Sequence, residues 1–262
     1  MRDFAEALAA RSAWFTGAAV AAWALVLAGA WLGLWRLGVW VVPMIALTVV
    51  TVAAAKAWAG WRRERFIREA PLPAFLPRKL REHYPHLTLR DAELVARGLR
   101  QFFIACNRVP GQYVAMPSKV VDVMWHEFIV HTRAYQAWCQ RALGRFLHHT
   151  PAEAPGASAR RNDGLRRAWY WACREESINP RRATRLPLLF ALDTKLDIPG
   201  GYRWAPDCRD VAAGNQGVYC GGDLSGDSLA GDGEGFGGCD SGGGHAGGDG
   251  DGGGDGGGCG GD

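Results

Sequence analysis

The sequence predicts an all-α protein with an N-terminal transmembrane hairpin, a cytosolic helical domain and a disordered tail. Residues 13–35 contain no ionisable side chain, and after Arg36 the stretch 37–55 contains none either. Residues 62–213 show apolar side chains at helical spacing. After Ala213 the chain holds 24 of its 36 glycines and neither lysine nor arginine. These shifts in composition exclude one globular domain throughout.

The first block, residues 1–61, is predicted to be a helical hairpin in the bilayer. A bilayer core needs roughly 20 apolar residues in a helix, so 13–35 and 37–55 can each span it. A cleaved signal peptide is the alternative, since Ala28-Gly29-Ala30 resembles a cleavage site, but the apolar run continues past it. The spans hold no acid, histidine or lysine, which favours an anchor over a transporter. Tryptophans mark both interfaces: Trp31, Trp35 and Trp40 at the turn, and Trp14, Trp58 and Trp61 at the opposite face.

The basic residues predict the orientation of the hairpin. The turn offers only Arg36, whereas both outer flanks are basic. The flanking cations are Arg2 and Arg11 before the hairpin, and Lys56, Arg62, Arg63, Arg65, Arg68, Arg78, Lys79 and Arg81 after it. By the positive-inside rule this pattern predicts a multi-pass protein of the cell inner membrane with cytoplasmic N- and C-termini. The lipid bilayer is therefore a predicted partner, with the basic flank on the anionic inner leaflet.

Residues 62–87 are predicted to form a basic juxtamembrane helix followed by a proline-rich linker. Arg62 to Glu69 would prolong the second span. Pro71, Pro73 and Pro77 would then break the helix and stiffen the linker.

Residues 88–213 are predicted to form an α-helical domain without strands. Start signals precede each apolar repeat. The first predicted helix begins after Thr88 as N-cap, and the second begins after Met116-Pro117-Ser118 and ends at about Val130. The third has Thr132 as N-cap and ends at about Leu147, and the fourth has Asp163 as N-cap and ends at about Glu176. A short fifth helix begins at Pro187. Loops are expected at 107–116 and 150–163.

One segment of this domain carries candidate chemistry. His126, His131, Cys139, His148 and His149 fall within 24 residues, and imidazole and thiolate are the ligand types of zinc. The pattern is not the H-E-x-x-H motif of zinc proteases. Five residues on a helix place His126 and His131 about 140° apart, so one metal requires a break between them, which a new N-cap at Thr132 would supply.

The packing interpretation of the same segment needs no metal. Asp122 lies four residues before His126, and a carboxylate–imidazole pair on one helix face would fix the packing of Trp125. Cys139 lies on an apolar face, where a cysteine acts as a small hydrophobe. His148 and His149 would suit the C-terminal dipole of a helix. Glu127 is the only acid beside the cluster that could act as a general base, and no nucleophile–base pair accompanies it.

The segment also resembles a known family. The matching residues are Met116-Pro117-Ser118, Val121-Asp122, Trp125-His126-Glu127-Phe128, Thr132, Tyr135, Cys139, Gly144-Arg145-Phe146-Leu147-His148-His149-Thr150-Pro151 and Leu186 to Asp193. They resemble the glycine-rich domain-containing protein family, and the later motif fits its bacterial members. The resemblance implies no enzymatic activity. Plant members have a second histidine two residues after the Trp-His pair, where this chain has Phe128.

The last block, residues 214–262, is predicted to be disordered. It holds too few apolar residues to offset the entropy of ordering. Its cysteines lack the paired spacing of zinc modules, and a cytosolic site predicts free thiols.

The first functional hypothesis is therefore a non-enzymatic, membrane-anchored protein that binds protein partners through the helical domain and the tail. The alternative is a metal-binding sensor or metal-dependent enzyme that uses the His/Cys segment, with zinc as its cofactor. Nucleic acid is not an expected partner, because the inner leaflet accounts for the basic flank.

Overall fold

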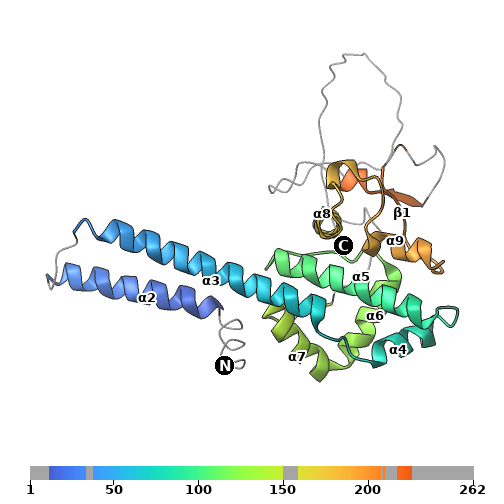
Figure 1. Cartoon of the computed structure of the whole chain (residues 1–262), viewed down its shortest axis with the longest axis horizontal. Helices are drawn as coiled ribbons and strands as arrows, with labels where there is room; N and C mark the ends of the chain where they lie inside the picture. The colour runs from blue at the N-terminus through green and yellow to red at the C-terminus, as the bar shows by residue number, and fades with distance from the viewer. Residues whose placement is uncertain (1–11, 34–37, 150–158, 208, 210–216, 226–262) are drawn as a thin grey trace, which may run out of the picture.

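A computed structural model describes residues 12–33, 38–149, 159–207, 209 and 217–225 of the chain, and it is mostly helical (Figure 1). The helices are α2 (Ser12–Trp31), α3 (Val41–Glu69), α4 (Phe75–His83), α5 (Leu89–Arg108), α6 (Lys119–Val130), α7 (Thr132–Leu143), α8 (Ala159–Glu175) and α9 (Leu188–Lys195), with 3-10 turns η1 (Pro180–Arg182) and η3 (Gly222–Leu224). Two strands, β1 (Arg203–Ala205) and β2 (Val218–Cys220), complete the described elements.

Helices α2 and α3 lie side by side and project from the rest of the molecule (Figure 1). By length and composition, α3 is the one helix among the described residues that could cross a membrane. Residues 17–31 of α2 form a shorter apolar helix. The indole Nε1 of Trp23 donates to Thr48 Oγ1 across the pair at 3.2 Å. Helix α2 ends at Trp31 and α3 begins at Val41; residues 34–37, which include Arg36 of the predicted turn, lie outside the described residues.

Helix α3 joins the projecting pair to the domain without a break. Its first half exposes apolar side chains such as Leu47 and Val50, whereas Ala59 and Ile67 in its second half are buried. The prediction that Arg62 to Glu69 prolongs the second apolar stretch is confirmed. The linker after it is not simply extended, because Phe75–His83 forms α4, whose Leu76 and Leu80 are fully buried in the core.

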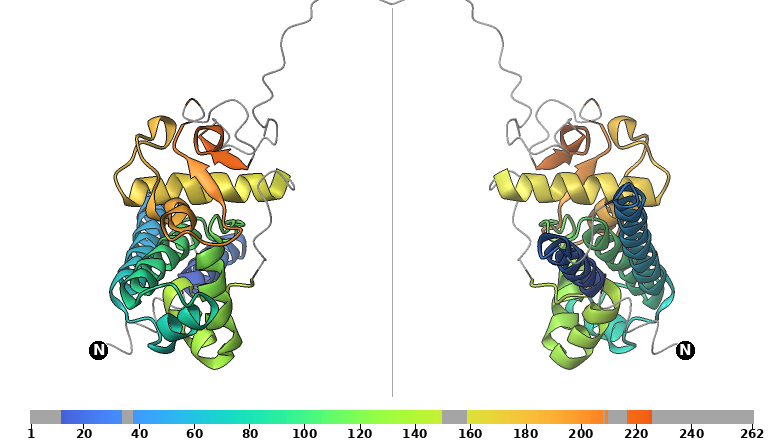
Figure 2. Two further views of the ribbon diagram at one scale, coloured as in Figure 1. Left: turned by 90° about the vertical axis from the view of Figure 1, so that its right-hand side faces the viewer. Right: turned by 90° about the vertical axis from the view of Figure 1, so that its left-hand side faces the viewer.

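The domain is built around α5, which packs against α3, α4, α6, α7, α8 and α9. Thr88 caps α5 as predicted: its hydroxyl accepts from the Asp91 amide while the Asp91 carboxylate accepts from the Thr88 amide. Ser118 caps α6 by a single bond, in which its hydroxyl accepts from the Val121 amide. Figure 2 shows α8 lying across one side of α5, opposite α4 and α7. This arrangement buries Phe102, Phe103 and Trp125 at the centre.

Three predicted helix boundaries are wrong. The residue that precedes α7 is His131, without a side-chain cap, rather than Thr132. The same helix ends at Leu143 instead of Leu147, because Gly144 takes a left-handed conformation (φ 68°), which terminates helices at low cost only for glycine. Helix α8 begins at Ala159, so Asp163 lies inside its first turns and binds Arg166 at 3.2 Å instead of capping.

The expectation of a strand-free domain that ends at residue 213 is also wrong. Strands β1 and β2 pair in parallel, with Trp204 opposite Tyr219. Gly221 lies so close to the Trp169 ring that a Cβ would stand 2.2 Å from a ring carbon. Leu224 is buried in the core. Residues 217–225, predicted as tail, therefore belong to the domain, because they cover Trp169 on α8.

The described cysteines are of two kinds. Cys106, Cys139 and Cys173 are free and buried. Cys220 at the end of β2 is disulfide-bonded. The expectation of free thiols throughout the tail is therefore wrong at Cys220, because β2 is held in the fold rather than solvated.

Candidate functional site

The predicted His/Cys segment forms the joint between α6 and α7. The indole Nε1 of Trp125 donates to Tyr135 Oη at 3.1 Å, and that hydroxyl donates to the Leu147 carbonyl at 2.6 Å. Burial raises the pKa of Tyr135, so the hydroxyl remains a donor at neutral pH. Trp125 and Tyr135 therefore hold α6, α7 and the segment after α7 together.

Asp122 pairs with a different histidine from the one predicted. Its Oδ1 lies 3.1 Å from His149 Nε2, and both side chains are mostly buried. The His149 ring stands edge-on to Trp125, with centroids 4.8 Å apart. His126 is exposed, and its ring centroid lies 5.8 Å from that of His149. The i,i+4 pairing of Asp122 with His126 is thus wrong, because the returning segment after α7 brings His149 to the carboxylate.

His131 lies in a second group of contacts at the other end of α6. Its ring stacks on Phe75 with centroids 3.9 Å apart, and its Nδ1 lies 2.9 Å from the Glu127 carbonyl oxygen. The Glu127 carboxylate faces His83 of α4, at 3.0 Å between Oε1 and Nε2. His131 and Glu127 therefore help to dock α4 onto α6.

The remaining predicted ligands, Cys139 and His148, border the Tyr135 group: Cys139 interacts with the Tyr135 hydroxyl, and the Phe146 ring lies between those of Tyr135 and His148. Cys139 is buried, and burial raises the pKa of its thiol. His148 is exposed and packs edge-on against Phe146. Within the part of the chain that the structure describes, no three His, Cys, Asp or Glu side chains are placed to hold one metal ion. The zinc assignment stays a prediction to which this geometry lends no support.

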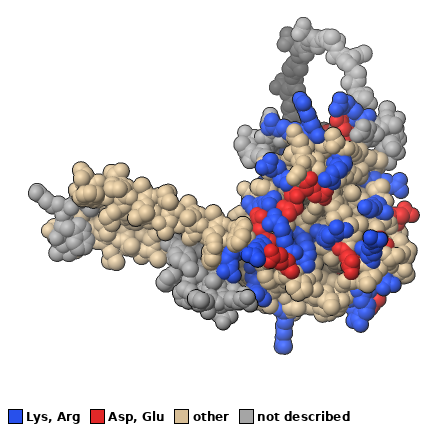
Figure 3. Space-filling model, in the orientation of Figure 1, with Lys and Arg blue, Asp and Glu red and all other residues tan. Residues whose placement is uncertain are grey.

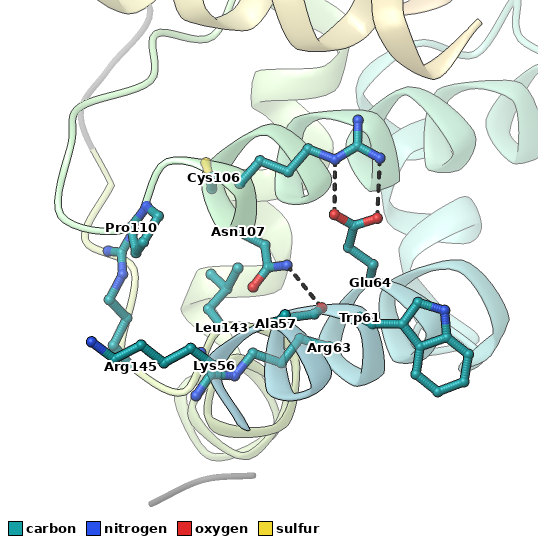
Figure 4. A pocket seen from close by; sticks show the side chains of 12 residues that line it. Lys56, Ala57, Trp61, Arg63, Glu64, Cys106, Asn107, Pro110, Leu143 and Arg145 are labelled. Carbon is teal, nitrogen blue, oxygen red and sulfur yellow. Dashed lines mark hydrogen bonds and ion pairs between the residues drawn. The ribbon is translucent and has the colours of Figure 1, made fainter. Parts of the chain in front are cut away.

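A cavity of about 780 Å³ lies where α3 enters the domain, and of the predicted segment 126–149 only Leu143 and Arg145, neither of them a predicted ligand, line it. Three segments form it: the middle of α3, the end of α5 and the end of α7 (Figure 4). Its lining residues are Lys56, Ala57, Gly60, Trp61, Arg63, Glu64, Cys106, Asn107, Arg108, Pro110, Leu143 and Arg145. Asn107 ties α5 to α3 by donating to the Gly60 carbonyl at 3.3 Å.

One side of the cavity is closed by an ion-pair network. Glu64 accepts two hydrogen bonds from Arg108, at 2.8 and 3.0 Å, and one from Arg68 at 3.0 Å. Arg68 and Arg108 both also bind Glu175 of α8. Burial acts to raise the pKa of Glu64, but the hydrogen bonds and charges of Arg108 and Arg68 outweigh it, so that this pKa is lowered. The network fixes α3 against α5 and α8.

The opposite end of the cavity gathers cations. Lys56, Arg63 and Arg145 lie near one another there, and Glu64 lies across from them (Figure 4). The Arg63 guanidinium occupies the space over Gly144: a Cβ on that glycine would stand 2.3 Å from Arg63 Nη2. Burial lowers the pKa of Arg63, and the nearby Arg145 lowers it further. Figure 3 shows the wider setting, in which Lys and Arg side chains gather on the domain while the described hairpin shows none on this face.

Replacing Glu64 by glutamine should weaken folding in a pH-dependent way. Because the folded-state pKa of Glu64 is lowered from 4.5, its stabilising effect is present above 4.5 and is lost as pH falls through the lowered value. At neutral pH we expect a loss of about 1–3 kcal/mol, measured by denaturation of the full chain in detergent. Below the lowered pKa the two proteins should converge, and an undiminished difference there would contradict the assignment. The matched control is Glu93→Gln on the exposed face of α5.

Comparison with known protein families gives a match that covers the helical domain. A family model described as UCP032817-like matches residues 62–224. The chain belongs to the UCP032817-like family. That description names no activity. No curated protein and no solved structure matches the chain.

The UCP032817-like region coincides with the part of the structure that folds around α5. It starts within α3, at the turn that lines the cavity, and ends with η3, which covers Trp169. Sequence reasoning identified Lys56 and Arg63 only as a basic flank and missed the cavity. The sequence gives no local sign of the cavity, because Arg108 and Arg145 come from the ends of two other helices that are distant in the sequence.

Proposed function

We propose that this UCP032817-like protein is a membrane-anchored, non-enzymatic interaction protein that holds a helical domain at the membrane surface. The observation that carries the proposal is the continuity of α3. Its apolar half contacts α2 and otherwise exposes apolar side chains such as Leu47 and Val50, and its basic half is part of the domain core. An exposed apolar helix of this length fits a bilayer better than water. Helix α2, packed along it, completes a multi-pass hairpin.

We further propose that the domain faces the cytoplasm at the inner membrane. The support is the excess of lysine and arginine after Ala55 together with the positive-inside rule. The disulfide at Cys220 argues the other way, since disulfides persist in oxidising compartments. A cysteine introduced as Glu93→Cys, at an exposed position of α5, tests this with a membrane-impermeant maleimide. Labelling only after lysis is expected, and labelling of intact cells would place the domain outside.

The resemblance of residues 116–200 to the glycine-rich domain-containing proteins is part of this proposal. That family has no established enzymatic activity, which is consistent with a non-enzymatic role. The residues after 225 lie outside the described part of the chain, and their role as a tether for weak contacts stays a prediction. The test is whether a chain that ends at Ala213, and one that ends at Ser225, retain the same partners as the full chain.

Membrane insertion is tested by charge substitution in α3. Val49 and Val50 are each more than 60% exposed, and a lysine at the centre of a spanning helix costs about 3 kcal/mol. We expect Val49→Lys with Val50→Lys to move the full chain from the alkali-resistant membrane pellet into the supernatant. Leu89→Lys with Val130→Lys, two exposed apolar positions in the domain, is the matched control and should stay in the pellet. A double variant in α3 that also stays there would contradict the span.

A further inference from the structure

The cavity at the domain junction lies at the depth of lipid headgroups if α3 spans the bilayer as proposed. Lys56 follows directly on the 15 uncharged residues, 41–55, that form the apolar half of α3. Arg63 comes about 10 Å further along the helix, so the pair brackets a headgroup layer roughly 5–7 Å deep. Trp58 and Trp61, both exposed, flank the cavity at the position typical of interfacial tryptophans.

The charge of the cavity favours an anion. Four of its lining side chains are cationic and one is a carboxylate. That carboxylate, Glu64, binds Arg108 and Arg68 at one side of the cavity, whereas Lys56, Arg63 and Arg145 gather at the other end. There Arg145 is close enough to disfavour the charge of Arg63. Like charges held together in a half-buried site are relieved by a bound anion.

The volume of the cavity and its combination of apolar and cationic lining residues indicate which kind of anion it could bind. The cavity holds about 780 Å³, which is far more than one phosphate ion fills. Ala57, Trp61 and Leu143 add apolar surface beside the cations. Arginine forks match phosphate oxygens in pairs, and basic pockets on the cytoplasmic side of membrane helices take phospholipid headgroups.

We propose that Lys56, Arg63 and Arg145 form a binding site for the phosphate group of an anionic phospholipid. The glycerol portion would lie against Ala57 and Leu143. The position of Gly144 is part of the site, because any side chain there would displace the Arg63 guanidinium. The inference rests on the proposed membrane function, from which it differs in naming the ligand and the residues that hold it.

The test measures binding by the full chain in neutral detergent, so that it does not depend on membrane insertion. Short-chain phosphatidylglycerol, short-chain phosphatidylcholine and inorganic phosphate are added separately, and bound lipid is read by native mass spectrometry and by the shift in Tm. Phosphatidylglycerol is expected to bind about tenfold more tightly than phosphatidylcholine. Inorganic phosphate that binds as tightly as the lipid would keep the phosphate site and assign it to a soluble ligand. Equal binding of the two lipids would overturn the proposal.

Two charge-matched variants separate the cavity from general attraction to a basic surface. Arg63→Gln with Arg145→Gln removes two cations from the cavity and should lower phosphatidylglycerol affinity by about tenfold or more. Arg62→Gln with Arg65→Gln removes two cations that lie over Trp58 and Trp61 and should leave it nearly unchanged. Equal losses in both pairs would overturn the site.

A second readout excludes a purely structural role for the cations. Arg145 stands just after the C-terminal end of α7, where a cation also complements the helix dipole. If that were its only role, the Arg63/Arg145 variant would lower the ligand-free Tm and keep its preference for phosphatidylglycerol, which would contradict the proposal. Lys56→Gln alone, at an exposed position, provides a variant that should fold normally and still lose affinity. If the Val49→Lys, Val50→Lys chain stayed in the alkali-resistant pellet, that result would contradict the membrane span. The lipid-binding results in detergent would stand separately from it.

Discussion

Replacing Asp193 by alanine should destabilise the domain more than any other single carboxylate substitution proposed here. The side chain is 2% exposed and accepts four hydrogen bonds. Its Oδ1 accepts from Ser118 Oγ at 2.7 Å and from the Val120 amide at 3.0 Å. Its Oδ2 accepts from the Lys119 amide at 2.7 Å and from the Tyr202 amide at 2.9 Å. One carboxylate thus joins α9, the start of α6 and the approach to β1.

The expected loss is about 3 kcal/mol or more, because the alanine variant leaves several buried donors without an acceptor. Two of those donors are first-turn amides of α6, where a negative charge also suits the helix dipole. Asp193→Asn keeps one acceptor oxygen and should lose less. Chemical denaturation of the full chain in detergent measures both, with Glu93→Ala as the exposed control. A midpoint for Asp193→Ala equal to that of the control would refute this role.

Replacing Gly164 by alanine should destabilise the domain although alanine is the better helix former. A Cβ at this position of α8 would stand 2.8 Å from the Ala115 amide nitrogen and 2.7 Å from two carbons of the Tyr113 ring. The Ala115 amide belongs to the backbone and cannot rotate away, so α8 would have to shift away from residues 113–115. Overpacking of this kind costs about 1–3 kcal/mol.

Gly60→Ala provides the opposite case within α3. A Cβ there meets no atom within 4 Å. The higher helix propensity of alanine, worth up to about 1 kcal/mol, should therefore raise the free energy of unfolding without a steric penalty. Thermal unfolding followed by circular dichroism compares the two variants in the same detergent. If Gly164→Ala raised Tm as Gly60→Ala is expected to, the close approach of α8 would be wrong.

The sequence was most informative where local chemistry decides the structure. Thr88 and Ser118 each satisfy a first-turn amide with a neighbouring hydroxyl, so their helix starts could be predicted from a few residues. The apolar half of α3 and its basic continuation follow from composition alone. The predicted helix runs past Gly144 to Leu147, but Gly144 is left-handed and ends α7, and a glycine at such a position is itself a stop signal.

The remaining features depend on segments that are distant in the sequence. His149 reaches Asp122 across 27 residues and replaces the expected local partner His126. Strands β1 and β2 contain three residues each, too few for alternation to be recognised. The basic cavity needs α5 and α7 to end beside α3. Spacing within one helix does not predict such meetings, because tertiary packing decides which ends come together.

If α3 spans a bilayer as proposed, its unbroken course makes the domain sensitive to the thickness of that bilayer. A spanning helix adjusts to a thinner or thicker hydrocarbon layer by changing its tilt. Since Ile67 is embedded in the core and the Glu64 network fastens the same helix to α5 and α8, the domain must rotate with that tilt. Membrane thickness would then set the angle at which the domain faces its partners and the depth at which Arg63 meets the lipid surface.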